Sequence, residues 1–154
     1  MLQSFRAKTL VFYGLPVVLW MTVIFLLSDQ TKDESKGLSD LFLAIFRFLD
    51  LDPVRMQELG VPHLIRKAAH VTEYFILYLL VYRLVYRHYP EKTSLLWTLM
   101  ICIVYAASDE YHQTFVPGRG GQVSDVGVDS IGMILALLGC WKMYGRTGKE
   151  VKNA

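Results

Sequence analysis

Hydrophobic residues gather in four long runs along the chain, separated by polar segments. The runs cover about residues 10–27, 63–86, 93–115 and 123–144. As an α-helix, each is long enough to cross about 30 Å of hydrocarbon, which takes about 20 mostly apolar residues. The pattern predicts an all-α fold, a polytopic membrane helix bundle of about four transmembrane helices. We expect it to form a single membrane domain over residues 1–154.

The first run, LVFYGLPVVLWMTVIFLL, contains no charged residue. Because Arg6 and Lys8 precede it, a signal peptide is the alternative to a transmembrane helix. Signal peptides have a shorter apolar region, of about 7–15 residues, and a small-residue cleavage site follows it. The run is longer and such a site is missing, so we expect an uncleaved transmembrane helix.

Residues 29–60, between the first two runs, are polar with one exception. Segment 37–51, GLSDLFLAIFRFLDL, repeats apolar residues at helical spacing but also contains Asp40, Arg47 and Asp50. It is too short and too charged to span a bilayer. We expect an amphipathic helix that lies in the membrane interface or caps the bundle. An ordinary packed surface helix is the alternative.

The composition agrees with a membrane protein and excludes some partners. Hydrophobic residues make up 53% of the chain and charged residues 19%, against about 45–50% and about 25% in soluble domains. The net charge is only +2, and no Lys/Arg cluster alternates with aromatic residues, so nucleic acid is not an expected partner. Cys102 and Cys140 fall within apolar runs, where we interpret them as small buried hydrophobic residues rather than as a disulfide or redox pair.

The distribution of basic residues predicts the orientation. Four spans place both termini on one side of the membrane. That side would carry Arg6, Lys8, Arg83, Arg87, Lys92, Lys142, Arg146, Lys149 and Lys152. The other side carries fewer basic residues, spread over a longer loop with many acids. The positive-inside rule therefore predicts a multi-pass protein of the cytoplasmic (inner) membrane with both termini in the cytoplasm.

Polar residues interrupt three of the runs, always at the end that this topology places outside. The three groups are Lys67, His70, Glu73 and Tyr74; Asp109, Glu110, His112 and Gln113; and Asp125 and Asp129. Within each group most residues are three or four positions apart and so share a helix face. We therefore expect the groups to face one another across the bundle. The residues expected to line one cavity open to the outer interface are His70, Glu73, Asp109, Gln113 and Asp125.

Ionisable side chains at membrane depth are costly, at about 2.5–3.5 kcal/mol each, so they face the bundle interior and pair or act there. The simplest interpretation is a structural hydrogen-bond network around Lys67, with Glu73 and Asp109 neutralising its charge. Two histidines and several carboxylates exceed what Lys67 and Arg119 need, and this excess favours a functional site.

Three functional interpretations remain open. The site could bind a divalent metal ion, with a ligand pool of His70, Glu73, Asp109, His112, Asp125 and Asp129. A His–carboxylate pair could instead act as a general base, with Arg119 and loop amides holding a phosphate or carboxylate. The loop sequence PGRGG lacks the Lys and Ser/Thr of a P-loop, which excludes a nucleotide site of that type. Finally, the cluster could relay protons in a small transporter, which would require an oligomer.

The segments RKAAHVTEYFILYLL and SDEYHQTFVPGRGGQVSDVGVDSIG, together with IFLLSDQ at the end of the first run, resemble the VanZ-like family of bacterial membrane proteins. The resemblance covers most of the chain. The residues that match the family pattern are Lys67, His70, Glu73, Tyr74, Asp109, Glu110, Gln113, Pro117, Gly118, Arg119 and Asp125. His112 fills a variable position of this pattern, and Asp129 stands where the family usually has Asn.

The resemblance implies a part in low-level resistance to teicoplanin and related lipid-tailed glycopeptides, but it supplies no reaction. Combined with an outward-facing polar pocket, it predicts a cell-envelope protein that acts on or binds a membrane lipid or a lipid-tailed glycopeptide. A non-catalytic membrane scaffold, or a small transporter or accessory protein, is the alternative.

If the protein is an enzyme, it would be a membrane-embedded hydrolase or transferase acting on an envelope lipid. In that version the catalytic residues are His70, Glu73, Asp109 and Glu110. The residues expected to bind substrate are Lys67, Tyr74, Gln113, Arg119 and Asp125. The oligomeric state is left open.

Overall fold

The computed structural model describes residues 10–30, 44, 47–48 and 52–150, and all regular structure in these ranges is helical. In chain order the elements are η1 (Leu10–Gly14), α2 (Leu15–Ser28), α4 (Pro53–Glu58), α5 (Val61–Val85), α6 (Glu91–Gln113) and α7 (Val123–Glu150). The four predicted runs are therefore four long helices, if η1 and α2 are taken as one continuous element. The predicted all-α membrane bundle is confirmed.

Three of the long helices are both long and apolar enough to cross a membrane: Val11–Ser28, Val61–Val85 and Val123–Met143. With 23 residues, α6 has the length, about 35 Å at 1.5 Å per residue. It is less apolar because it carries charged residues near both ends, Glu91 and Lys92 at the start and Asp109 and Glu110 near the end. The predicted count of four spanning helices is thus an approximate one.

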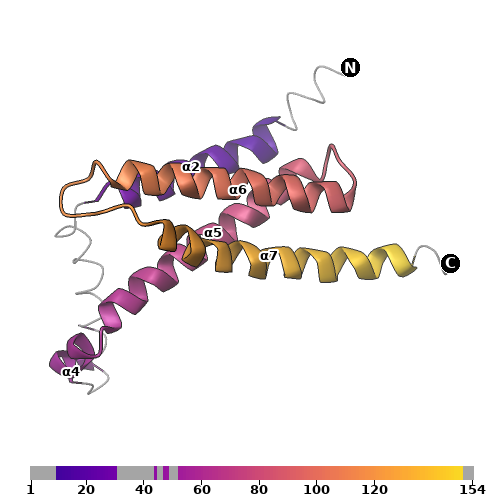
Figure 1. Ribbon diagram of the computed structural model, residues 1–154. Coiled ribbons are helices and arrows are strands. Elements are labelled where there is room, and N and C mark those ends of the chain that lie inside the picture. Colours follow the sequence, from indigo (N-terminus) through magenta and orange to yellow (C-terminus); the bar gives the residue numbers. More distant parts are fainter. Residues whose placement is uncertain (1–9, 31–43, 45–46, 49–51, 151–154) are drawn as a thin grey trace.

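The central helix is α5, which packs against α2, α6 and α7 and runs diagonally across them in Figure 1. The start of η1 and the end of α7 lie at one end of the bundle (Figure 1). The loop between α6 and α7 lies at the opposite end, on the same side as α4. This arrangement gathers the end of α6 and the starts of α5 and α7 in one region.

The crossing of α5 and α7 depends on a glycine. A Cβ atom at Gly132 of α7 would collide with the backbone carbonyl oxygen of Val71 on α5. Small residues at helix contacts let backbones approach closely, which is a common way to pack helices in membranes. Tyr74, Leu77 and Tyr78, which follow Val71 on α5, are fully buried. Close backbone packing therefore fixes how α5 and α7 present their polar ends.

Long side chains attach α2 to the rest of the bundle. The indole Nε1 of Trp20 donates a hydrogen bond of 2.9 Å to the backbone oxygen of Glu73. The hydroxyl of Tyr105 donates one of 2.6 Å to the backbone oxygen of Met21. At the other end of the bundle the guanidinium of Arg87 bonds the hydroxyl of Tyr13 and lies over its ring. These contacts place the end of α2 beside the polar groups of α5 and α6.

Two segments differ from the sequence-based expectation or lie beyond it. The expected amphipathic segment 37–51 lies outside the described residues, apart from isolated positions 44, 47 and 48. The short helix α4 was not predicted; it is capped by Asp52, whose side chain accepts a hydrogen bond from the Val54 amide, and it ends before Gly60. Gly60 has a positive φ of 72°, a conformation that glycine adopts without steric cost.

Candidate functional site

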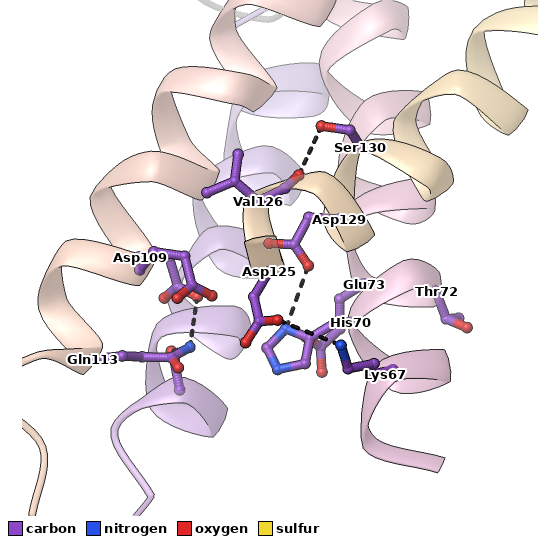
Figure 2. A network of polar contacts seen from close by, with 12 residues as sticks. Lys67, His70, Thr72, Glu73, Asp109, Gln113, Asp125, Val126, Asp129 and Ser130 are labelled. Atoms are coloured by element: carbon purple, nitrogen blue, oxygen red, sulfur yellow. Dashed lines mark hydrogen bonds and ion pairs between the residues drawn. The ribbon is translucent and has the colours of Figure 1, made fainter. Parts of the chain in front are cut away.

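The predicted polar groups meet at the end of the bundle where α6 ends and α5 and α7 begin. Figure 2 shows Lys67, His70 and Glu73 of α5 opposite Asp125 and Asp129 of α7. The structure therefore brings the three groups, each a polar stripe on one helix, to one place. The chain direction of each helix puts its polar end there.

A cavity of about 230 Å³ opens at this end of the bundle. Its lining residues are His63, Arg66, Lys67, His70, Gln113, Gly118, Arg119, Gly120, Asp125, Val128 and Asp129. Basic side chains from both α5 and the α6–α7 loop contribute to the lining, together with two histidines and two carboxylates. The cavity is thus suited to a polar ligand with charged groups.

The basic side chains of the cavity differ in how they are paired. Lys67 Nζ lies 3.6 Å from Asp125 Oδ1, so the expected neutralisation of Lys67 by Glu73 and Asp109 is wrong. Asp125 is nearer because α7 begins directly beside the first turns of α5. Within the described part of the chain, Arg66 and Arg119 form no salt bridge.

The charges around Arg119, in the loop between α6 and α7, favour the binding of an anion. Burial lowers the pKa of Arg119, and the nearby positive charge of Arg66 lowers it further, while the carboxylates of Asp109, Glu73 and Glu110 act in the opposite direction. A guanidinium stays charged at neutral pH despite such a shift. Two like charges in a partly buried setting are destabilising, and an anion between them would remove the repulsion.

The imidazole of His70 lies between two carboxylates. His70 Nδ1 is 3.6 Å from Asp129 Oδ1 and 3.7 Å from Glu73 Oε2. Both distances are longer than a hydrogen bond. Asp129 is only 1% exposed, and neither of its carboxylate oxygens has a hydrogen-bond partner. A buried polar atom left unpaired costs about 1–3 kcal/mol, so this part of the cavity has unused bonding capacity.

A second polar layer lies deeper, beside the end of α2. Gln113 Nε2 donates to Ser28 Oγ at 2.6 Å and to Asp109 Oδ2 at 3.3 Å. Asp109 is 3% exposed and does not line the cavity, and neither does Glu73. The prediction that these two carboxylates line it is therefore wrong. Asp109 lies about one helical turn deeper than Gln113 on α6, and Glu73 lies about one turn deeper than His70 on α5.

Two further predicted residues lie near the cavity but outside its lining. Glu110 Oε2 accepts a hydrogen bond of 2.9 Å from the backbone amide of Gln122 and so holds the α6–α7 loop in place. A Cβ atom at Gly121 would collide with the backbone oxygen of Glu110. Tyr74 is fully buried, with its ring 6.4 Å from that of Tyr105. Catalysis by Glu110 and substrate binding by Tyr74 stay predictions.

His112 lies apart from the cavity. Its Nε2 atom is 3.2 Å from Asp29 Oδ1, and its ring stacks on Phe25 at a centroid distance of 4.4 Å. Among the described residues, no three His, Cys, Asp or Glu side chains come together in a way that could hold a metal ion. The proposed ligand pool is divided between separate contacts.

Sequence analysis missed three polar residues of the site. His63 and Arg66 line the cavity, and they extend the face of α5 that carries Lys67 and His70 by one turn. Helical spacing alone would have found them. Ser28, which is 2% exposed, bonds Gln113 from the end of α2. No spacing rule connects it to the other groups, because this contact depends on how α2 packs.

Comparisons with known proteins agree with the architecture. The family model described as VanZ/LLP1 matches residues 13–144. This range includes every residue that lines the cavity. No curated protein and no solved structure matches the chain.

Proposed function

The chain belongs to the VanZ/LLP1 family, and from this premise we propose that its polar cavity binds the anionic headgroup of a cell-envelope amphiphile. The protein would be a multi-pass protein of a bacterial cytoplasmic membrane. Its basic residues favour cytoplasmic termini, so the cavity would open at the outer leaflet. Lipid-linked ligands could then reach it laterally while their tails stay in the bilayer.

The observation that carries this proposal is the lining of the cavity by Arg66, Lys67 and Arg119. Guanidinium groups bind phosphate and carboxylate with two parallel hydrogen bonds, which adds both energy and geometric specificity. Lys67 already has Asp125 as a partner. The two arginines form no salt bridge within 4 Å among the described residues, so they are the groups available to an incoming anion.

The size of the cavity supports a headgroup rather than a whole glycopeptide. Its volume is about 230 Å³, below the range of about 300–1,000 Å³ that is usual for pockets holding drug-sized ligands. We infer that protection against teicoplanin and related lipoglycopeptides, the role expected of a VanZ-like protein, would act through an envelope lipid.

A binding experiment on the purified full-length protein tests the proposal. Arg66→Ala and Arg119→Ala should each weaken binding of phosphatidylglycerol in native mass spectrometry by about tenfold, the loss expected for a charged hydrogen bond. Arg55→Ala is the matched control, because Arg55 is exposed on α4 and does not line the cavity. Unchanged binding in both cavity variants would exclude the proposed anion site.

Turnover at the bound headgroup is a second candidate. It is supported by His70, which has a carboxylate on each side within 4 Å. A general base must reach its proton within about 2.6–3.2 Å, and such contacts are often longer before a ligand binds. In this version His70 and Glu73 would exchange protons with the ligand, and loss of headgroup from a defined lipid would be the readout.

A further inference from the structure

We propose that the cavity selects a zwitterionic headgroup, one with a primary ammonium group beside its phosphate, as in phosphatidylethanolamine. The ammonium would donate hydrogen bonds to Asp129 and His70, and the phosphate would lie at Arg66 and Arg119. This inference rests on the proposed function, because it keeps the same anion site and adds a second requirement to it.

The buried carboxylate of Asp129 is the first argument. It lines the cavity but is 99% buried, and neither oxygen has a hydrogen-bond partner. Figure 2 shows Asp129 and His70 pointing toward each other from α7 and α5. When it is ionised, a carboxylate in this position accepts hydrogen bonds only. It therefore calls for a ligand that supplies N–H or O–H donors at the inner part of the cavity.

The distances suit an ammonium group in particular. His70 Nδ1 and Asp129 Oδ1 are 3.6 Å apart, so a nitrogen at about 2.9 Å from each would complete a hydrogen-bonded triangle. In the imidazole tautomer protonated at Nε2, the Nδ1 atom is an acceptor. A primary ammonium has three donors, two of which satisfy these two acceptors. Glu73 Oε2, 3.7 Å from the same imidazole nitrogen, is a further acceptor beneath the cavity lining.

The balance of charge gives an independent argument. The cations at this end of α5 and in the loop are Arg66, Lys67 and Arg119. The carboxylates at the same end of α5, α6 and α7 are Glu73, Asp109, Glu110, Asp125 and Asp129. The carboxylates outnumber the cations. With all of these groups ionised, a purely anionic ligand would add to a surplus of negative charge. A zwitterion satisfies the arginines and at the same time brings a positive charge to the carboxylates.

Depth along the helices orients the ligand. Arg66 lies one turn before His70 on α5, and Arg119 is in the loop, so the anion site is at the mouth of the cavity. Asp129 lies one turn further along α7 than Asp125. The ammonium therefore enters first and the phosphate stays at the mouth. From there the acyl chains of a lipid can remain in the bilayer.

Headgroup comparison on the unmodified protein is the main test. The purified full chain is titrated in native mass spectrometry with phosphatidylethanolamine, phosphatidylcholine and phosphatidylglycerol of identical acyl chains. We expect phosphatidylethanolamine to bind at least about tenfold more tightly than phosphatidylcholine, because a quaternary ammonium cannot donate hydrogen bonds. Equal binding of all three lipids would overturn the zwitterion inference but leave the anion site intact. Binding of none would overturn the anion site as well.

Single substitutions test which residue is responsible for the headgroup preference. Asp129→Asn should reduce the preference for phosphatidylethanolamine over phosphatidylglycerol by about tenfold, with little change in phosphatidylglycerol binding. Ser130→Ala on α7 and Thr72→Ala on α5 are matched controls. The hydroxyl of Ser130 donates to the backbone oxygen of Val126, and that of Thr72 to the backbone oxygen of Ala68. Neither residue lines the cavity, so both variants should retain the preference. A preference unchanged in Asp129→Asn would place the ammonium elsewhere and contradict the inference.

A competition arm distinguishes a lipid from a soluble ligand with the same chemistry. Free O-phosphoethanolamine is added to the protein–lipid complex, with phosphocholine as the control. Displacement by the free headgroup at equal affinity supports a soluble zwitterion as the ligand. Retention of the lipid at high headgroup concentration supports a membrane lipid. Displacement by phosphocholine as efficient as that by O-phosphoethanolamine would contradict selection of a primary ammonium.

Discussion

At the polar end of the bundle, some side chains line the cavity and others hold the surrounding structure in place. Lys67, Asp125 and Asp129 line the cavity, whereas Gln113 both lines it and reaches inward to Ser28. Glu110, by contrast, holds the loop through the Gln122 amide. Substitutions at this scale should therefore separate loss of ligand binding from loss of stability.

Glu73 is the residue at which these two outcomes differ most sharply. Its ion-pair contact among the described residues is with His70, at 3.7 Å, which is charged only when the imidazole is protonated, and not with Lys67, whose partner is Asp125. Glu73→Gln should therefore leave no cation stranded and give a folded protein of nearly normal Tm. We expect it to protect cells poorly from a lipoglycopeptide, because an amide cannot accept a proton or neutralise an ammonium. Full protection by this variant would rule out a role for Glu73 in proton transfer or cation binding.

Gln113 should behave in the opposite way, with a clear effect on stability. Gln113→Ala removes the hydrogen bonds to Ser28 and Asp109 and leaves buried polar atoms unpaired, at a cost of about 1–3 kcal/mol. For a protein of this size each kcal/mol lowers Tm by about 2–4 °C. Ser108→Ala, at an exposed position on the same helix, is the control in a thermal melt of the detergent-purified protein. Equal Tm values for both variants would show that the Gln113 contacts add nothing to stability.

The helix α6 has an apolar face and a more polar face. The outward face of α6 carries Leu96, Trp97 and Met100, while its buried face carries Ser94 and Thr98. The charged residues near the two ends of α6 lower its mean hydropathy, so an average over the whole helix does not reveal this apolar face. A helix whose polar groups face its neighbours can still lie in a bilayer, because those groups are withdrawn from lipid. Packing of α5 against α7 is the contact that most directly shapes the cavity, since both helices line it.

A glycine substitution tests this helix contact. Gly132→Ala adds a methyl group against the backbone of Val71, and overpacking of this kind costs about 1–3 kcal/mol. Gly139→Ala on the same helix is the matched control, because a Cβ atom there meets nothing within 4 Å. We expect Gly132→Ala to lower Tm by several degrees and Gly139→Ala to leave it unchanged or slightly raised. A Gly132→Ala variant as stable as the Gly139→Ala variant would mean that the two helices do not pack this closely.

The whole molecule has its polar cavity at one end and the start of η1 and the end of α7 at the other (Figure 1). Orientation in the membrane therefore decides which leaflet the cavity meets. More basic residues lie near the chain ends and the α5–α6 connection than near the cavity end, and this excess favours the cytoplasm for the termini.

Cysteine labelling on intact cells tests the orientation. Gly120→Cys introduces a thiol at a cavity position where a Cβ atom has open space, and Lys149→Cys introduces one near the end of α7. An impermeant thiol reagent should label the first variant and not the second. The unmodified protein is the control for Cys102 and Cys140, which are buried. The reverse labelling would put the cavity in the cytoplasm and exclude an outer-leaflet ligand.

The sequence by itself determined the helices and the polar stripes on them. Four apolar runs matched the four long helices closely, because the length of a run and the spacing of its polar residues are local properties. The same spacing placed Lys67 and His70 on one face of α5. It also gave the end of the bundle at which the stripes meet, since chain direction alternates from one helix to the next. The VanZ-like resemblance, carried by motifs on three of these helices, was confirmed by the family match over residues 13–144.

Only the tertiary structure decided which polar residues reach the cavity and which partners they have. The pairing of Lys67 with Asp125 and the contact of Ser28 with Gln113 both join different helices. Such contacts depend on the depth and crossing of each helix, which Gly132 allows by close backbone approach. Helical periodicity fixes the face on which a side chain lies, but not how far a neighbouring helix has slid along that face. For this reason the stripes were predictable, while the separation between the cavity lining and the layer beneath it was not.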